Sequence, residues 1–430
     1  MKYQAYEEYK DSGVEMLGAL PSIWRINQVR YLLKDGAEGI KIGPFGSALK
    51  LEDMVDSGTR VYGQENVIKK DFTLGKRKIS QSKFEEMEVY QAFTDDLLIT
   101  MMGTSGKCEL VPEDADVGII DSHLLRLRVK ESEILPRFFR LLIDECYEIE
   151  NQIKISGKGS IMHGLNSSIV KSLTLPVPNL PEQRTILNFL DHETAKIDTL
   201  IEKQQQLIKL LKEKRQAVIS HAVTKGLNPN APMRDSGVEW LGEVPEHWGS
   251  TQIKYGYDIT LGKMLQKEAK SSEDKNKLYL KAMNIQPEGL YLDKIGKMWF
   301  SPNDMKSLRL QKGDVLISEG GDVGRACIWM AELPECYIQN AINRARPLKE
   351  RSSRYLLYWM SMLKDSEYID TLCNKATIAH YTAEKLESSP LLLPENDEAN
   401  QIASFLDNET LKIDKLIEKA DSLILFINER

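Results

Sequence analysis

The chain has 430 residues, 42% of them hydrophobic and 28% charged, a composition typical of globular proteins with two or three domains. No apolar run reaches the roughly 18 residues that a membrane helix needs, and residues 1–10 lack the apolar core of a signal peptide, so we expect a cytoplasmic protein. The formal net charge of -7 argues against a protein that coats nucleic acid unaided, so any contact with DNA must rest on local basic patches or on a basic partner.

The first part of the chain, residues 24–178, is predicted to be a globular α/β domain. Short apolar runs such as 97–101 and 124–129 indicate strands between glycine and serine turns. Residues 137–149 are predicted to form an amphipathic helix. The segment 102–106 fits neither G-x-G-x-x-G nor a P-loop, and we interpret it as a tight turn between two strands.

A long helix is predicted next, from Pro181 to about Val223. Proline suits the first turn of a helix, and the nearby Glu182 is favoured there by the helix dipole. The segment 226–232, which is rich in glycine, asparagine and proline, ends this helix and forms a linker.

The rest of the chain repeats the first part. Residues 11–24 (DSGVEMLGALPSIW) recur as 235–248 (DSGVEWLGEVPEHW), and residues 189–203 recur as 405–419 with 12 of 15 positions identical. Residues 96–107 likewise match 314–325, which places the glycine-containing segment 320–324 at the position of 102–106. Because the matches run in order, one ancestral unit has been used twice. The interiors agree only at short landmarks, so two similar frames are expected to carry different recognition surfaces.

The second copy adds an amphipathic helix over 353–362 and a second long helix. Both long helices carry an apolar stripe, and two such stripes on one chain most simply pack against each other as an antiparallel coiled coil. The alternative is that each helix packs on its own globular domain. The residues expected in this packing are Ile197, Leu200, Ile201, Leu207, Ile208, Leu211, Ile413, Leu416, Ile417, Leu423, Ile424 and Ile427.

The predicted fold class is α+β, with two similar globular α/β domains separated by two long helices in a pseudo-twofold internal repeat. The expected boundaries are domain 1 at 1–178, a central helical spacer at 179–225, a linker at 226–233, domain 2 at 234–394 and a C-terminal helical spacer at 395–430. The second copy has no counterpart of residues 216–225, so a truncated C-terminal spacer is one interpretation.

The signatures of catalysis are missing from the sequence. There is no Asn-Pro-Pro-aromatic or Asp-Pro-Pro-aromatic tetrapeptide of the kind that amino-methyltransferases use, and no G-x-x-x-x-G-K-[ST] loop. The histidines form no H-x-H or H-E-x-x-H pair and the cysteines no C-x-x-C pair. We therefore predict no catalytic residue, no cofactor site and no metal site on this chain, and reduced, buried cysteines.

Local basic patches favour a contact with DNA. Residues 69–78 place five cations in ten residues around an aromatic, and both copies carry arginines at corresponding places, although such runs are often only solvated surface. His163 and His380 follow hydroxyl and lysine residues that suit phosphate contacts, with a structural turn as an equal alternative. The expected DNA-binding residues are Lys69, Lys70, Lys76, Arg77, Lys78, Lys107, Lys158, His163, Lys281, Asn284, Arg325, Arg344, Lys375 and His380.

Taken in order, these motifs resemble the specificity (S) subunit of a type I restriction-modification enzyme across essentially the whole chain. The segment 235–248 and its copy at 11–24 resemble the opening of each half. The turn at 180–184, followed by the helical residues 197–201, 214–216 and 222–224, resembles the central helical region of the family. The strand and turn at 314–324 resemble the body of its target recognition domains.

This resemblance implies a non-catalytic subunit in which each target recognition domain reads one half of a bipartite double-stranded DNA target. The helices would set the spacing and dock two methyltransferase (M) subunits, and restriction/translocase (R) subunits would join for cleavage. S-adenosylmethionine, ATP and Mg would then lie on the partner subunits. Two other classes compete with this reading: a self-contained nuclease or methyltransferase, and a coiled-coil adaptor that joins two protein-binding modules without touching DNA.

Overall fold

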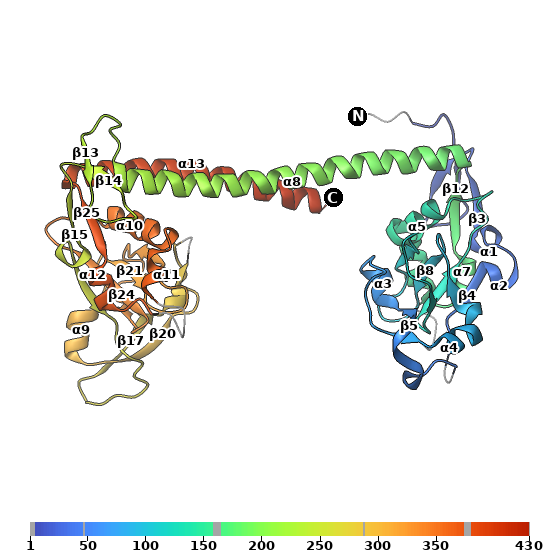
Figure 1. Ribbon diagram of the computed structural model, residues 1–430, viewed down its shortest axis with the longest axis horizontal. Coiled ribbons are helices and arrows are strands. Elements are labelled where there is room, and N and C mark those ends of the chain that lie inside the picture. The colour runs from blue at the N-terminus through green and yellow to red at the C-terminus, as the bar shows by residue number, and fades with distance from the viewer. Residues whose placement is uncertain (1–4, 46–47, 158–164, 287–288, 374–379, 430) are drawn as a thin grey trace. The chain divides into compact units, whose positions relative to one another are not determined.

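The computed structural model describes residues 5–45, 48–157, 165–286, 289–373 and 380–429 (Figure 1). The chain divides into two compact units, Met1–Lys196 and Ile197–Arg430, and the long helix α8 contributes residues to both. Each unit is described by itself.

Unit 1 contains short strands and helices that precede the first part of α8. Its strands are β1 (Tyr9–Asp11), β2 (Ala19–Pro21), β3 (Arg25–Gln28), β4 (Ile40–Ile42), β5 (Met54–Tyr62), β6 (Lys78–Ile79), β7 (Gln91–Ala92), β8 (Leu97–Thr100), β9 (Cys108–Leu110), β10 (Gly118–Ile120), β11 (Leu124–Leu127) and β12 (Thr174–Val177). Its helices are α1 (Val29–Leu32), α2 (Gly36–Gly39), α3 (Gln64–Ile68), α4 (Gln81–Glu86), α5 (Pro136–Glu145), α6 (Tyr147–Gly157), α7 (Ser167–Ser172) and α8 (Leu180–Lys225).

Unit 2 follows the same order for most of its elements, with a β18–β19 hairpin in addition. Its strands are β13 (Met233–Asp235), β14 (Glu243–Pro245), β15 (Gly249–Gln252), β16 (Tyr257–Leu261), β17 (Lys275–Leu280), β18 (Ile285–Gln286), β19 (Gly289–Leu290), β20 (Gly296–Phe300), β21 (Val315–Ser318), β22 (Ala326–Ile328), β23 (Tyr337–Ile338), β24 (Ile342–Pro347) and β25 (Pro390–Leu393). Its helices are α9 (Pro302–Leu308), α10 (Ser353–Asp365), α11 (Tyr368–Leu372), α12 (Ala383–Ser388) and α13 (Asn396–Asn428).

The first sheet has the same topology in both units, whereas the second has the order β6-β5-β10-β7 in unit 1 and β20-β17-β23 in unit 2. The antiparallel sheet β4-β11-β8-β9 of unit 1 corresponds to β16-β24-β21-β22 of unit 2. In the second sheet, β5 pairs in parallel with β10 in unit 1, as β17 does with β23 in unit 2. A two-stranded ladder, β3–β12 or β15–β25, leads into the long helix of each unit. The duplication read from the sequence is thus a duplication of fold.

The strand β8 is buried along its whole length because a core covers each of its faces. Leu97 and Ile99 belong to the core that also contains residues of α5, while Leu98 packs with Tyr62 and Ile120 of the second sheet. The run at 97–101 thus forms a strand, as the sequence predicts, and the structure places that strand between two layers.

The glycine-containing segments after β8 and β21 are hairpin turns, which confirms the interpretation as tight turns. β8 pairs antiparallel with β9, and β21 pairs antiparallel with β22. Thr100 Oγ1 accepts a hydrogen bond from Lys107 N at 3.0 Å, and Ser318 Oγ accepts one from Arg325 N at 3.1 Å. A side-chain hydroxyl at the equivalent position thus closes each turn. Gly106 and Gly324 supply the positive φ angles (87° and 77°) that the turns require.

One predicted helix is in fact two. The expected helix over 137–149 is interrupted at Cys146, whose ψ of 115° is extended, so α5 ends at Glu145 and α6 begins at Tyr147. The helix expected over 353–362 is α10, which continues to Asp365. The long helix α8 ends before Gly226, whose φ of +76° explains the stop.

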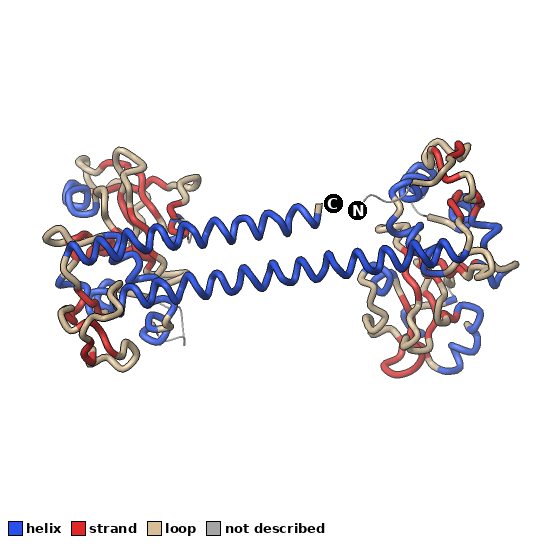
Figure 2. Tube along the Cα trace, turned by 90° about the horizontal axis from the view of Figure 1, so that it is seen from above, coloured by secondary structure: helices blue, strands red, loops and turns tan. Residues whose placement is uncertain are grey.

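In unit 2, α13 lies along the C-terminal part of α8 and runs in the opposite direction (Figures 1 and 2). Arg215 of α8 donates a hydrogen bond to Asp414 of α13 at 3.0 Å. Nearer the globular part, Val223 of α8 shares a core with Ile402 of α13. Moving forward along α8 therefore means moving backward along α13, so the pair is antiparallel.

The rows of least exposed side chains follow alternating spacings of three and four residues, as in a coiled coil. On the described helices they are positions 201, 204, 208, 211, 215, 218 and 222 of α8 and positions 406, 410, 413, 417, 420, 424 and 427 of α13. The sequence prediction needs correction at five stripe positions that are exposed instead: Ile197, Leu200, Leu207, Leu416 and Leu423. These five residues lie beside the row. The row itself includes the polar residues Gln204, Arg215 and Thr410, which a search for apolar side chains passes over.

Candidate nucleic-acid interface

Matched arginine–aspartate pairs hold the central strand of each unit. Arg128 donates to both carboxylate oxygens of Asp96 at 2.6 and 3.0 Å, and Arg346 does the same to Asp314 at 2.7 Å each. Each aspartate immediately precedes β8 or β21 and also accepts a backbone N–H, at 2.8 Å in unit 1 and 2.7 Å in unit 2. These arginines are therefore structural.

Arg344 was expected to bind DNA, and its burial overturns that expectation. Only 3% of its surface is exposed, since β24 directs its side chain between the two sheets. Its guanidinium donates to Ser307 O at 2.6 Å, Asp258 Oδ2 at 2.9 Å and Thr260 Oγ1 at 2.6 Å. Burial, reinforced by Arg346, lowers its pKa. Arg126 is its counterpart in unit 1, with 4% exposed and donation to the backbone carbonyls of Val89 and Gln91.

Asn284 needs the same correction. Its side chain accepts the backbone N–H of Lys281 at 2.8 Å and donates to Tyr291 O at 2.7 Å, and 1% of the residue is exposed. Asn66 at the corresponding place in unit 1 accepts the N–H of Gly63 at 2.9 Å. Both asparagines cap the short turn after the parallel strand, so their side-chain amides are hydrogen-bonded within the protein.

Two of the expected lysines belong to an ion-pair network in unit 1. Lys70 lies 3.6 Å from Asp144 Oδ2, and Lys107 lies 3.4 Å from Asp144 Oδ1. Arg140 joins the same carboxylates, at 3.0 Å from Glu109 and 3.5 Å from Asp144. About half of each lysine side chain remains exposed, so both retain a solvent-facing ammonium group.

The remaining cations of the 69–78 patch are more accessible. Lys69 and Lys76 are exposed, and Lys78 is half-buried in β6. Arg77 forms an ion pair with the buried Asp121 at 2.8 Å, with part of its side chain in solvent. The patch therefore presents a basic surface beside the edge of the second sheet.

In unit 2, three expected residues lie near the β21–β22 hairpin or the parallel strand. Arg325 donates to Gln286 Oε1 at 2.9 Å, and Lys281 lies over the ring of Tyr279 at 5.6 Å from its centroid. His380 is half exposed, with Nδ1 3.9 Å from Glu319 Oε1. Burial raises the pKa of Glu319, and His380 partly opposes that shift. Lys158, His163 and Lys375 lie outside the described residues.

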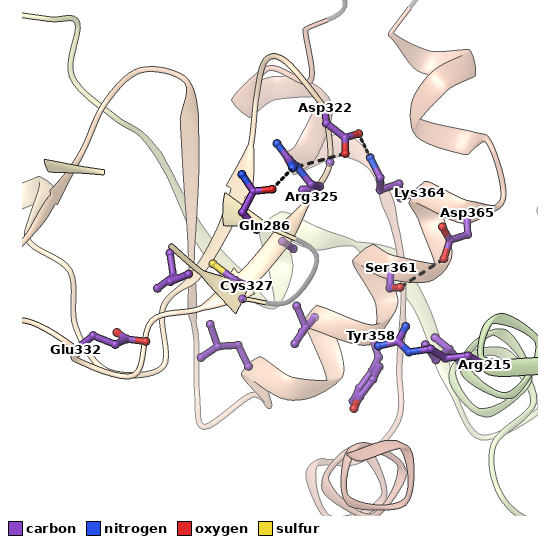
Figure 3. A pocket seen from close by; sticks show the side chains of 17 residues that line it. Arg215, Gln286, Asp322, Arg325, Cys327, Glu332, Tyr358, Ser361, Lys364 and Asp365 are labelled. Carbon is purple, nitrogen blue, oxygen red and sulfur yellow. Dashed lines mark hydrogen bonds and ion pairs between the residues drawn. The ribbon is translucent and has the colours of Figure 1, made fainter. Parts of the chain in front are cut away.

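A cavity of about 490 Å³ opens in unit 2 beside α10 (Figure 3). In unit 1 the corresponding positions carry the ion-pair network of Arg140, Asp144 and Glu109. The corresponding residues of unit 2, by strand register and helix position, are shorter or uncharged: Leu357, Ser361 and Cys327. Lys364 pairs with Asp322 at its rim. Matched positions of the two units thus carry different side chains beside the strand hairpin.

Sequence reasoning missed the polar residues that build the frame: Asn66, Asp96 and Asp314. Their recurrence at matched positions of both copies could have identified them. A residue that both copies keep, although their interiors differ, is expected to serve the fold. Among the described residues, no three or more His, Cys, Asp or Glu side chains are grouped as a metal site would require. No helix in the described ranges is long and apolar enough to cross a membrane.

Comparisons with known proteins agree on one family. Its description is type I restriction modification DNA specificity domain, and it matches residues 48–210 and 253–421. A relative from Methanocaldococcus jannaschii, provisionally named the MjaX specificity subunit of a type I restriction enzyme, is 24% identical over 96% of this chain and 92% of its own length.

Two solved structures share the fold at 17% identity, each over 95% of this chain and 96% of its own. One, from work on complex assembly and conformational transition of the type I R-M system, has a TM-score of 0.62. The other is the HsdS subunit from Thermoanaerobacter tengcongensis, with a TM-score of 0.56.

Proposed function

Because the chain belongs to the family of type I restriction-modification DNA specificity domains and contains that domain twice, we propose that it is a specificity subunit whose two domains each read one half of a bipartite double-stranded DNA target. The observation that carries this proposal is that both units keep the same structural hydrogen bonds but carry different side chains around them. The arginine–aspartate pairs and capping asparagines recur in both units. Matched positions nearby carry different side chains, Arg140, Asp144 and Glu109 in unit 1 and Leu357, Ser361 and Cys327 in unit 2.

The proposed DNA contacts use the expected residues that retain a solvent-facing polar group. Lys69, Lys76 and Arg77 of unit 1 and Lys281 and His380 of unit 2 meet this condition. Cations of this kind bind phosphates and fix the register of the protein, while base edges are read by a smaller set of side chains. Lys70, Lys107 and Arg325, which form ion pairs but stay partly exposed, and the half-buried Lys78 also belong to the proposal. Lys158, His163 and Lys375 remain in it on their sequence pattern alone.

The two spacer helices are proposed to set the distance between the half-sites and to dock two methyltransferase subunits. Exposed leucines support the docking: Leu210, Leu411, Leu416 and Leu425 are each at least half exposed on α8 or α13. A partner that covered these side chains would bury apolar surface that is now in solvent. Restriction/translocase subunits would join this assembly, and S-adenosylmethionine, ATP and Mg would be bound by the partners rather than by this chain.

A domain exchange tests the proposal. Residues 20–178 are replaced by those of a relative with a different target, and DNA methylated by the subunit together with its methyltransferase is sequenced. We expect one half of the recognised motif to change and the other half to stay as it was. A change in both halves would contradict modular recognition.

A mobility-shift experiment separates the competing classes. Labelled duplex is titrated with the chain alone and with the chain plus methyltransferase subunits. A specificity subunit retards the duplex selectively once the methyltransferase is present. An adaptor that does not touch DNA adds no sequence selectivity, and a self-contained enzyme modifies or cuts the duplex without a partner.

A further inference from the structure

The repeated segments 11–24 and 235–248 contribute none of the proposed DNA contacts, yet they fold identically. Each forms a two-stranded hairpin, β1–β2 or β13–β14. At the start of each, an aspartate accepts the N–H of a glycine two residues later, at 3.0 Å in unit 1 and 2.9 Å in unit 2. Gly13 and Gly237 have φ angles of 69° and 72°, which explains the shared Asp-Ser-Gly.

Each repeated segment ends in a tryptophan that reaches a spacer helix. Trp24 Nε1 donates to Glu182 Oε1 at 2.9 Å, and Trp248 Nε1 donates to Glu398 Oε2 at 3.0 Å. Both glutamates lie in the first turn of their helix, where the dipole favours a carboxylate. The tryptophan also directly precedes the strand that pairs with the lead-in strand of that helix.

A second attachment lies nine residues further along each helix. Arg137 at the start of α5 donates to Asp191 at 2.9 and 3.2 Å, and Arg354 at the start of α10 donates to Asp407. Nine residues of helix span about 13.5 Å. Two bonds separated along a rigid rod fix the angle of the attached domain as well as its position.

Further partners strengthen the first attachment differently in the two units. In unit 1, Tyr6 also donates to Glu182, and that hydrogen bond is the largest cause that raises the pKa of Tyr6 to about 12. In unit 2, His247 Nε2 lies 2.9 Å from Glu398 Oε2. The glutamate is thus the shared acceptor in both units, although its additional neighbour is different.

We propose that each Trp–Glu bond, together with its Arg–Asp bond, is a clip that fixes a recognition domain on its spacer helix and thereby restricts the gap permitted between the half-sites. Trp24, Trp248, Arg137 and Arg354 are on this view positioning residues that never touch DNA. The inference rests on the function proposed above, because a gap exists only if the target is bipartite.

The test loosens the clip of unit 2 in the full chain assembled with its methyltransferase subunits. Trp248→Phe removes the N–H donor and keeps an aromatic ring, and Arg354→Met removes the guanidinium and keeps an aliphatic stem. Each is made alone and in combination. Lys412→Met is the matched control, because Lys412 pairs with Glu409 at 2.7 Å within α13 and joins no domain to the helix.

The readout is the affinity for duplexes that carry both half-sites at the native gap, or at a gap one base pair shorter or longer. We expect discrimination against the wrong gaps to fall about tenfold in the double variant, since a hydrogen bond to a charged group contributes on that order. Preference for the sequence of each half-site should stay unchanged, and the control should match the unmodified protein.

Two results would overturn the clip. One is gap discrimination that stays unchanged in every variant. The other is an equal loss of affinity at all gaps, which is what a purely stabilising role produces. If instead the unmodified complex recognises no gapped target, the failure lies with the proposed function rather than with the clip.

Discussion

At the scale of residues, two arginines only two positions apart have different environments. Arg126 lies in β11 and Arg128 directly follows that strand, yet Arg126 is buried between the sheets while Arg128 pairs with Asp96. Removing a charged guanidinium from water is costly, and acceptors in the protein offset part of that cost. Folding therefore fixes the acceptors around such a residue, and its burial keeps the guanidinium out of reach of a ligand.

Arg344→Met should destabilise the protein without changing how it binds DNA. The guanidinium donates to Ser307, Asp258 and Thr260, and hydrogen bonds of a charged donor contribute roughly 1.5–3 kcal/mol. We expect the free energy of unfolding to fall by about 2 kcal/mol in urea denaturation. Unchanged stability combined with weaker binding would reinstate Arg344 as a DNA ligand.

Lys76→Glu should weaken DNA binding and leave the stability of the protein unchanged. Lys76 is exposed, so reversal of its charge has little effect on folding. If Lys76 contacts a phosphate, affinity should fall alike for cognate and unrelated duplexes, and the slope of log affinity against log salt should flatten by about one. Fluorescence anisotropy at several salt concentrations measures both quantities. A slope and affinity equal to those of the unmodified complex would remove Lys76 from the proposed interface.

At the scale of elements, the pairing of α8 with α13 depends on one row of side chains per helix. The row alternates spacings of three and four residues and tolerates polar members such as Gln204 and Thr410. Leucines just outside it remain in solvent, so neighbouring positions on one helix have different roles.

Leu211→Ala and Leu210→Ala should separate these roles. Leu211 is 9% exposed and Leu210 is 53% exposed. Truncating the buried leucine should cost about 2–3 kcal/mol of unfolding free energy, whereas truncating the exposed one should change stability by less than about 0.5 kcal/mol. Thermal unfolding of the isolated subunit followed by circular dichroism tests this.

The same pair tests the docking proposal. Leu210→Ala should weaken binding of the methyltransferase in a titration, while it leaves the fold intact. Equal effects of the two substitutions on stability would show that the row of contacts is misassigned. Unchanged methyltransferase affinity would exclude Leu210 from the docking surface.

At the scale of the whole molecule, α8 connects the two units through 46 helical residues, about 69 Å of helix. Part of this length packs on the globular parts, and the remainder is available as a spacer. We expect half-sites centred about one DNA turn, roughly 34–36 Å, apart on the same side of the duplex.

Lengthening both helices together should lengthen the gap in the target. Inserting seven residues near Gln204–Gln206 of α8 and seven near Ala420 of α13 preserves the alternation of three and four and adds about 10.5 Å. The gap should grow by about three base pairs while both half-site sequences stay the same. Sequencing of methylated DNA reports both, and a fixed gap would end the model of the helices as a ruler.

The sequence alone determined the features that depend on neighbouring residues and on repetition. The duplication, the hairpin turns at 102–106 and 320–324, and the end of α8 at Gly226 follow from local turn chemistry and from matching one copy to the other. Family membership follows from the same ordered motifs.

Only the tertiary structure decided which polar residues are available to a ligand. Arg344 and Asn284 look like surface residues in the sequence, but both are buried. Arg344 is directed inward from its strand, and Asn284 caps a turn. The partners of Trp24 and Trp248 lie 158 and 150 residues away, beyond the reach of any local pattern. Burial and long-range pairing arise when separate layers meet, because each side chain then faces whatever the opposing layer presents rather than what its own segment encodes.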